Sequence, residues 1–200
     1  MTILSILFLM LILPGSLYAL FSLLCVLGLF KGSGGLRKDL APAARELPAV
    51  SVLKAIKGLD PSCAENLSSF CAQDYPRYEV LFGFRDHDDP AIPVAEAITA
   101  SAPCDARVVV RHGGEGTNQK ALNLQALADE ARYPMLALSD SDMVVDRHYL
   151  RQIVAEFQDN GKTGIVTSLY KISRPASFGS ALESLNIALD FIPSVLVARR

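Results

Sequence analysis

Charged residues are missing from the first part of the sequence: no Asp, Glu, Lys, Arg or His occurs from Met1 to Phe30. As an α-helix this stretch would extend over roughly 45 Å, whereas the hydrocarbon core of a bilayer is about 30 Å thick. A secretory signal peptide would need a basic start and an apolar run of only about 7–15 residues, so that class of segment is disfavoured. We expect residues 1–30 to form a single transmembrane helix, with a re-entrant hairpin broken at residues 14–16 as the alternative.

Several other absences exclude classes of protein. The formal net charge is only −2 and no basic stripe is present, which argues against nucleic-acid binding. Neither a Gly-x-Gly-x-x-Gly fingerprint nor a P-loop occurs, so dinucleotide-dependent oxidoreductases and nucleoside triphosphatases have little support. The 4 cysteines lack Cys-x-x-Cys spacing and the 3 histidines are scattered, which disfavours a zinc cluster and favours free thiols in a reducing compartment.

The residues that follow the apolar segment carry more basic than acidic side chains. They are Lys31, Arg37, Lys38 and Arg45, against Asp39 and Glu46. Basic residues next to a span are usually retained in the cytoplasm, so we expect a single-pass membrane protein whose remaining chain faces the cytoplasm. Residues 31–47, which are rich in glycine, proline and charge, are interpreted as a linker.

Beyond Pro48, short apolar runs alternate with segments of helical spacing. The runs that indicate strands are residues 49–55, 78–84, 107–111, 134–138 and 163–169. The segments that indicate helices are residues 62–73, with Ser62 as the expected cap, 91–101, 118–131 and 147–158. Nearly all-apolar strands that alternate with helices imply a parallel sheet covered on both faces. We therefore expect residues 48–200 to form a doubly wound α/β domain, in which ligands bind beyond the carboxyl ends of the strands.

Acidic residues gather after two of the expected strands. Asp86, Asp88 and Asp89 follow one strand, and Asp140 and Asp142 follow another. Two carboxylates at positions x and x+2 can hold one Mg²⁺ or Mn²⁺ ion and leave coordination positions for phosphate oxygens. In sugar transfer, such a metal offsets the charge that grows on the departing diphosphate. A D-x-D pair is common in turns, but its place after an apolar strand, beside a second acidic strand end, favours a metal site.

Three further residues are candidates for ligand contacts. Asp60, near Lys57, either contacts the base or ribose of a nucleotide or closes a turn. Lys120 lies near the start of an expected helix, where backbone N–H groups can hold anions. A lysine that simply faces solvent is the alternative for this position.

Seven stretches, taken together and in this order, resemble the ceramide glucosyltransferase family, including its bacterial relatives, one branch of which acts in hopanoid biosynthesis. They are SVLKAIKGLDP (51–61), NL (66–67), QDYP (73–76), DHDDPAI (86–92), GTNQK (116–120), SDSD (139–142) and DFIPSVLVA (190–198). The resemblance covers the chain from about residue 50 to residue 200 and includes the preceding span. It implies a GT-A fold, UDP-glucose as donor, a lipid hydroxyl such as that of ceramide as acceptor, and inversion at the anomeric carbon.

The resemblance also implies roles for the acidic and basic residues. Asp89 would be the first functional aspartate, with Asp86 and Asp88 beside it near the uridine or ribose. Asp140 would be the second, at the diphosphate and the metal, and Asp142 would complete the D-x-D pair. The remaining candidates for donor contacts are Lys57, Asp60 and Lys120.

The sequence departs from the family pattern in two places. Ala55 stands where the family usually has proline. The third aspartate of the family, taken as its catalytic base, and its Q-x-x-R-W motif have no counterpart, and the sequence contains no tryptophan at all. We therefore expect a member that is incomplete at its C-terminus.

Several alternatives stay open at this point. The chain could be an inactive remnant that only binds a nucleotide sugar, or a hopanoid or polysaccharide glycosyltransferase. The helical stretch 177–190 and the apolar residues 191–198 could form an amphipathic interfacial element or the start of an acceptor-side layer.

Overall fold

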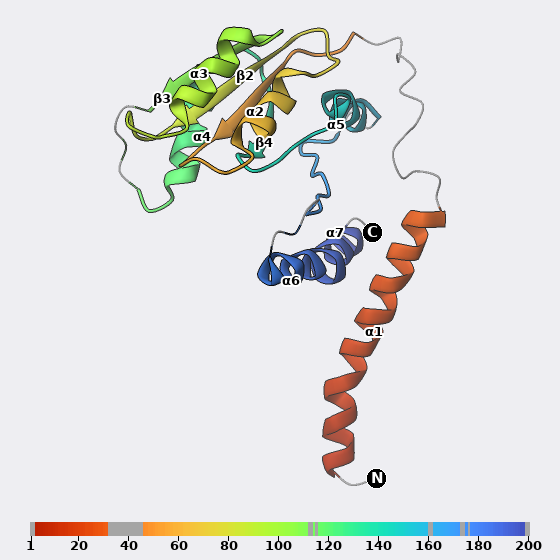
Figure 1. The fold of residues 1–200 in the computed structure, drawn as a ribbon. Coiled ribbons are helices and arrows are strands. Elements are labelled where there is room, and N and C mark those ends of the chain that lie inside the picture. Colours follow the sequence, from red (N-terminus) through yellow and green to blue (C-terminus); the bar gives the residue numbers. More distant parts are fainter. Residues whose placement is uncertain are drawn as a thin grey trace. The chain divides into compact units, whose positions relative to one another are not determined.

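A parallel sheet with intervening helices forms the largest part of the structure (Figure 1). The computed structural model describes residues 3–31, 46–111, 114, 116–159, 162–172, 175 and 177–198. The elements of the sheet domain are β1 (Val50–Ala55), α2 (Cys63–Cys71), β2 (Tyr78–Phe84), α3 (Ile92–Ser101), β3 (Asp105–Val110), α4 (Gln119–Glu130), β4 (Met135–Asp140) and α5 (Tyr149–Asp159). The strand order is β3-β2-β1-β4 and all pairings are parallel, which confirms the expected α/β class.

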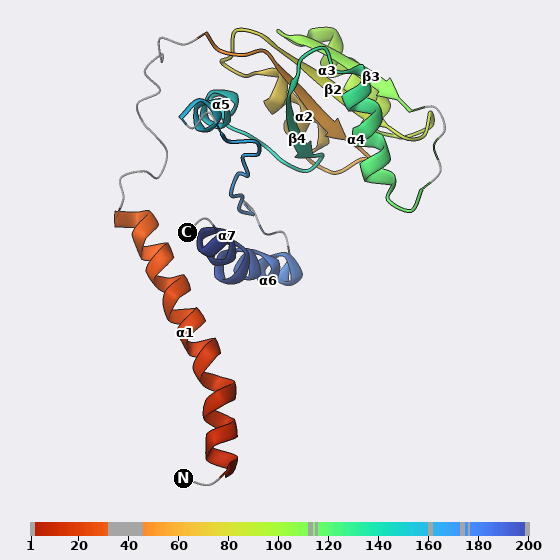
Figure 2. The same cartoon turned by 180° about the vertical axis from the view of Figure 1, so that it is seen from behind.

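Different helices cover the two faces of this sheet, as the opposite views of Figures 1 and 2 show. On one face, Val52 of β1 packs in a large core cluster with Phe70 of α2 and Val154 of α5. On the other face, Leu53 packs in a smaller cluster with Leu127 of α4. Successive residues of a strand point to opposite faces, so the apolar run of β1 supplies both layers.

The strands differ from the sequence-based expectation mainly at their ends. β3 begins at Asp105 and β4 ends at Asp140, so both strands extend two residues beyond the expected bounds at one end. Polar residues are accommodated there because the ladder hydrogen bonds use only the backbone. The first acidic residue of the D-x-D pair is therefore the last residue of a strand, and the turn begins after it.

The strand expected over residues 163–169 is wrong. These residues are described without any strand pairing, and Ile165 is 85% exposed. A strand needs a hydrogen-bonded neighbour, and an apolar run alone does not supply one.

The expected cap at Ser62 is also wrong in one respect. Ser62 occupies the N-cap position of α2, but its side chain makes no capping hydrogen bond. Its backbone angles, φ −102° and ψ 16°, lie outside the extended region from which a cap side chain reaches the first turn. α4, in contrast, is capped by Asn118, whose side chain accepts a hydrogen bond of 3.0 Å from the backbone N–H of Ala121.

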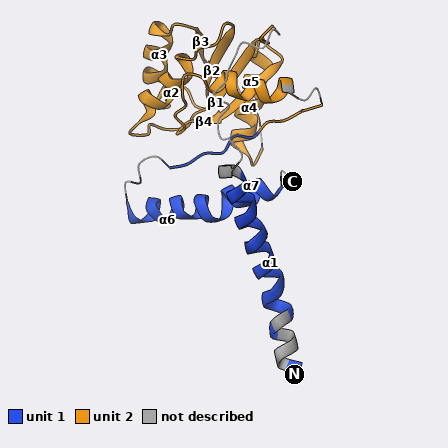
Figure 3. Ribbon diagram, turned by 90° about the vertical axis from the view of Figure 1, so that its right-hand side faces the viewer, with its two compact units in different colours: residues 1–39, 167–200 blue, residues 40–166 orange. Residues whose placement is uncertain are grey.

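Residues 1–39 and 167–200 form one compact unit and residues 40–166 form the other (Figure 3). The first unit contains α1 (Ile3–Lys31), α6 (Phe178–Asn186), a π-helical segment η1 (Ile187–Phe191) and α7 (Ile192–Ala198). α1 continues through Pro14 without a break, so it is a single helix and not a re-entrant hairpin. The hydroxyls of Tyr18 and Ser194 lie 3.1 Å apart and link α1 to α7.

Two helices within the described ranges are long and apolar enough to cross a membrane. They are Met10–Gly28 and Phe178–Ala198, with mean hydropathies of 2.2 and 1.5. The expected transmembrane helix is therefore present by length and composition, and a second candidate accompanies it. Most of the expected linker, including three of the four basic residues used to orient the chain, lies outside the described residues. The proposed domain boundaries stay a prediction.

Candidate functional site

The carboxyl ends of β1, β2 and β4 lie at the same edge of the sheet. Ala55, the last residue of β1, is in register with Gly83 of β2 and with Asp140 of β4. In a parallel sheet the loops that follow such residues leave on the same side, which is where ligands bind in this class of fold. The candidate residues at this edge are Lys57, Asp60, Asp86, Asp88, Asp89, Lys120, Asp140 and Asp142.

Asp89 connects the loop after β1 with the loop after β2. One of its carboxylate oxygens accepts a hydrogen bond of 2.8 Å from the backbone N–H of Gly58, and the other accepts one of 2.9 Å from that of Ala91. Gly58 has φ +75°, a left-handed conformation that glycine adopts without strain. The half-buried carboxylate of Asp89 thus holds the conformation of the loop that carries Lys57 and Asp60.

The other acidic residues of the loop after β2 are on the surface. Asp86 and Asp88 are exposed, and Asp86 forms an ion pair of 3.4 Å with Arg85. The backbone carbonyl of Asp86 accepts a hydrogen bond of 3.3 Å from the N–H of Asp89. These contacts shape the turn and leave both exposed carboxylates accessible to solvent.

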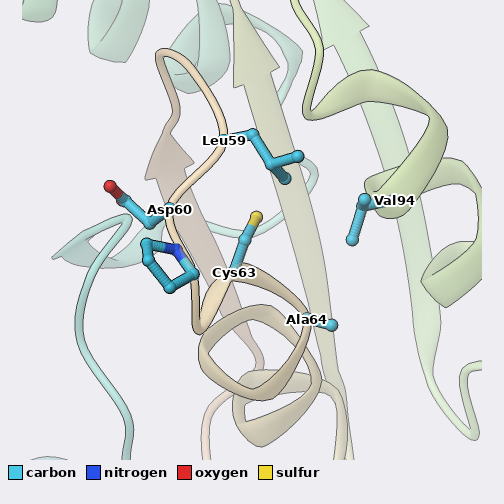
Figure 4. A pocket seen from close by; sticks show the side chains of 6 residues that line it. Leu59, Asp60, Cys63, Ala64 and Val94 are labelled. Atoms are coloured by element: carbon cyan, nitrogen blue, oxygen red, sulfur yellow. The ribbon is translucent and has the colours of Figure 1, made fainter.

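An open pocket of about 350 Å³ lies beside the loop after β1 (Figure 4). Leu59 and Cys63 line it from this loop and α2, and Val94 faces them from α3, while the carboxylate of Asp60 points away from Val94. Burial raises the pKa of the Cys63 thiol, and the nearby Asp60 and Asp89 carboxylates add to the rise. The pocket therefore offers an apolar wall with a neutral thiol.

Asp140 and Lys120 form an ion pair across this edge of the sheet. Lys120 belongs to the first turn of α4, and its ammonium group donates to the carboxylate of Asp140. Both side chains are more than half exposed. The pairing shows that Lys120 reaches the D-x-D pair, which its distance along the sequence did not reveal.

Lys54 is a feature of the site that the sequence analysis missed. It lies in β1, is 0% exposed, and donates hydrogen bonds to the backbone carbonyls of Asp140 at 2.7 Å and Met143 at 3.5 Å. Its ammonium nitrogen lies 3.7 Å from the centre of the Phe70 ring. Burial lowers the pKa of Lys54 to about 7, although the Asp142 and Asp140 carboxylates act to raise it. The one available signal was a single charge in an otherwise uncharged run.

The donor set at the end of β4 fits a hard divalent cation. Asp140 and Asp142 are both exposed and offer carboxylate oxygens, the ligand type that Mg²⁺ and Mn²⁺ prefer. Among the residues that the structure describes, no group of three His, Cys, Asp or Glu side chains could hold a metal. A cation held by two carboxylates keeps its other positions for water and phosphate oxygens.

Comparison with known proteins gives relatives for most of the chain. A ceramide glucosyltransferase of Caenorhabditis elegans is 31% identical over 142 residues, which cover 70% of this chain and 30% of that protein. The ceramide glucosyltransferase of Komagataella phaffii is 33% identical over 135 residues, covering 64% of this chain and 26% of the relative. The chain thus spans about a third or less of the length of these relatives.

A solved structure and a family match complete the comparison. The mannosyltransferase of Pyrobaculum calidifontis, in complex with GDP-Man and Mn²⁺, superposes on 82% of this chain and 50% of its own with a TM-score of 0.52 and 20% identity. This likeness supports the GT-A type of α/β fold. The family described as Glycosyl transferase family 21 matches residues 7–200. The chain belongs to this glycosyltransferase family.

Proposed function

We propose that this chain carries the donor-binding site of a membrane-bound glycosyltransferase that moves a hexose, with glucose expected, from a UDP-sugar to a lipid hydroxyl such as that of ceramide, with inversion. The observation that carries this proposal is the Lys120–Asp140 ion pair beside Asp142, at the carboxyl edge of a parallel sheet. This arrangement places a cation, an exposed pair of carboxylates and a helix N-terminus together. Groups of these kinds bind a nucleotide diphosphate and its metal.

Different residues of the site would contact different parts of the UDP-sugar donor. Asp140 and Asp142 would hold Mn²⁺ or Mg²⁺, which supplies Lewis-acid stabilisation of the leaving diphosphate when bound. Lys120 would contact the diphosphate from the first turn of α4. Asp89 would act on the uridine side by fixing the Gly58 loop.

The apolar pocket and the remaining polar residues fit the same half of the donor. Leu59, Cys63 and Val94 line a space beside the loop that Asp89 fixes, and it is large enough for a nucleobase. Contacts to the base, the ribose or the sugar are assigned to Lys57, Asp60, Asp86 and Asp88. In the mannosyltransferase of the same fold the bound ligand is GDP-Man with Mn²⁺, and we carry over only the class: a nucleotide diphospho-sugar with a divalent metal.

The names of the relatives and the apolar helices support a membrane lipid as acceptor. Both matched relatives are ceramide glucosyltransferases, and α1 has the length and hydropathy of a span. The basic residues after α1 support a cytoplasmic position for the sheet domain.

Donor binding tests the proposal directly. The full 200-residue chain in detergent micelles is titrated with UDP-glucose in the presence of Mn²⁺ or Mg²⁺ by calorimetry. We expect binding by the native chain and a loss of at least about tenfold in both variants, because Asp140→Asn removes a charged metal ligand and Asp89→Asn loosens the Gly58 loop. Asp129→Asn, on the exposed side of α4, is the matched control and should bind as the native chain does.

Two outcomes would contradict this assignment. If the folded chain fails to bind UDP-glucose in the presence of Mn²⁺ and also in the presence of Mg²⁺, there is no donor site at this edge. Equal affinity for GDP-mannose would remove the preference for a UDP-sugar. Transfer of labelled glucose to ceramide, compared with a hopanoid and with a growing polysaccharide, then identifies the acceptor class.

A further inference from the structure

Lys54 occupies a position where a charged side chain is costly. Its neighbour on the same face of β1 is the fully buried Val52, and the Phe70 ring lies directly against its ammonium group. Removing a cation from water is unfavourable unless its donors find acceptors and its charge finds a partner. The contacts of the ammonium group should therefore show what this lysine does.

Both hydrogen bonds of Lys54 go to the turn that carries the D-x-D pair. They end on the backbone carbonyls of Asp140 and Met143, the two residues that bracket the turn, at 2.7 and 3.5 Å. The turn's own backbone hydrogen bond, from the N–H of Met143 to the carbonyl of Asp140, is long at 3.4 Å. The shortest contact that holds the beginning of this turn therefore comes from β1.

A second side chain holds the far end of the same segment. The hydroxyl of Ser69 on α2 accepts a hydrogen bond of 3.2 Å from the backbone N–H of Val145. Phe70, the next residue of α2, lies against the Lys54 ammonium. The segment from Asp140 to Val145 is thus fastened to the core at both ends, while the carboxylates of Asp140 and Asp142 remain exposed.

We propose that Lys54 is a positioning residue, whose ammonium group holds the Asp140–Met143 turn by its carbonyls and so sets where the Asp140 and Asp142 carboxylates stand. The inference rests on the proposed function, in which these two carboxylates bind the divalent metal. Lys54 contacts neither metal nor donor and acts only through the turn. A displacement of ligands by about 1 Å is enough to lower the affinity of a metal site sharply.

The substitution Lys54→Met separates this role from two others. It shortens the unbranched side chain by one atom and removes its charge and its donors. Loss of a buried charge can destabilise a fold, so metal binding is compared only for variant protein whose circular dichroism matches that of the native chain. A positioning role predicts weaker metal binding. If the lysine acted mainly as a positive charge near the cation, its loss would tighten metal binding. If it only stabilised the core, the folded variant would bind metal as the native chain does.

The experiment measures Mn²⁺ affinity and the local order of the turn in parallel. Free Mn²⁺ is followed by electron paramagnetic resonance for the full chain in micelles and for Lys54→Met, and hydrogen exchange is recorded for peptides covering residues 139–146. Val52→Ala is the matched control, because it leaves a cavity on the same face of β1 without touching the turn. Lys54→Gln, which keeps one N–H donor group, is the second variant and should lose less affinity than Lys54→Met.

We expect Lys54→Met to lose about tenfold or more in Mn²⁺ affinity, with faster exchange confined to residues 139–146. Val52→Ala should melt at a lower temperature and keep its Mn²⁺ affinity. Unchanged or tighter Mn²⁺ binding in a folded Lys54→Met chain overturns the inference, as does unchanged exchange in the turn. If the native chain itself binds no Mn²⁺, the proposed metal site fails, and the exchange measurement alone decides whether Lys54 orders the turn.

Discussion

The carboxylate of Asp89 accepts a hydrogen bond of 2.8 Å from the backbone N–H of Gly58, which lies 31 residues earlier in the sequence. This single contact joins the loops after β1 and β2. An acidic motif that follows a strand end suggests direct contact with the ligand, but both oxygens of Asp89 already accept backbone hydrogen bonds. Its influence on a donor would therefore pass mainly through the shape of the Gly58 loop.

The first prediction concerns this tether. Asp89→Asn leaves one oxygen and places an amide group where the second acceptor stood, so one of the two loop contacts is lost. We expect the free energy of unfolding to fall by about 1.5–3 kcal/mol, because hydrogen bonds to charged groups contribute about that much. Urea unfolding measures the change. Asp88→Asn, one residue earlier and exposed, should remain within about 0.5 kcal/mol of the native chain, and equal effects of the two substitutions would contradict the tether.

The second prediction concerns the ion pair between Lys120 and Asp140. In the absence of metal, the ammonium group of Lys120 pairs with the Asp140 carboxylate, to which the cation would have to bind. Lys120→Met should therefore raise the affinity for Mn²⁺ alone by a few fold, the size expected when an exposed ion pair no longer competes. The same substitution should lower the affinity for UDP-glucose in the presence of Mn²⁺, because a diphosphate contact is lost.

Separate titrations with Mn²⁺ and with UDP-glucose test this pair of opposite effects. Lys171→Met, an exposed lysine of the other unit, is the control and should change neither affinity. If Lys120→Met changed the affinities for Mn²⁺ and for UDP-glucose in the same direction, Lys120 would not switch from Asp140 to the diphosphate when the donor binds.

The third prediction concerns Glu79, a fully buried acid of β2. Its carboxylate accepts hydrogen bonds from the Ser51 hydroxyl at 2.6 Å, the Arg107 guanidinium at 2.5 Å and the backbone N–H of Arg132 at 2.7 Å. Glu79→Gln removes the charge partner of the partly buried Arg107 guanidinium, which should cost about 1.5–3 kcal/mol in unfolding free energy. Glu79 lies near the opposite, amino-terminal edge of the sheet, so donor binding by the folded variant should not change.

The effect of Glu79 should depend on pH in a defined direction. Burial acts to raise its pKa, but the hydrogen bonds from Ser51, Arg132 and Arg107 outweigh it and hold the pKa below the ordinary value of 4.5. The folded state thus binds this proton less readily than the unfolded state, so the stabilisation is present above pH 4.5 and is lost as the pH falls below it. The difference in unfolding free energy between native chain and Glu79→Gln should shrink as the pH falls below 4.5. A constant difference would show that the pKa of Glu79 is the same in the folded and unfolded states.

The fourth prediction concerns the packing of α4 on β2. A Cβ atom at Gly83 would lie 2.6 Å from Cδ1 of Leu127 and 2.8 Å from Oδ1 of Asn123, whose amide group donates to the Gly83 carbonyl at 2.9 Å. Gly83→Ala should therefore destabilise the chain by about 1–3 kcal/mol through overpacking. Gly164→Ala is the control, since nothing lies within 4 Å of its Cβ position. Thermal unfolding compares the two, and equal melting temperatures would contradict the packing.

The sequence predicted the sheet domain well because its strands are apolar on both faces. Runs such as residues 78–84 can only be buried between two layers, so their number and alternation with helices already imply the fold. The strand expected over residues 163–169 failed because apolarity does not specify a pairing partner.

The site was only partly accessible to sequence reasoning. Placement of the acidic loops at one edge follows from parallel strands, and the structure brings Asp140 and Lys120 into contact as well. The tether from Asp89 to Gly58 depends on loop geometry, and no local pattern encodes it. In the sequence, Lys54 is only one charged residue in an apolar strand. Its role could not be predicted because the carbonyl that accepts its hydrogen bond belongs to Asp140, 86 residues later.

That separation has a consequence for the order in which the fold forms. Pairing of β1 with β2 brings together residues such as Ser51 and Glu79, which are 28 positions apart, whereas Lys54 and Asp140 are 86 apart. Closing the longer loop costs about 1 kcal/mol more in chain entropy, and such distant parallel pairing is slow. We infer that β4, and with it the acidic turn, joins the sheet last during folding. Pulse-labelled hydrogen exchange should then find the amides of β1 and β2 protected before those of β4, and simultaneous protection would show that the whole sheet forms in one step.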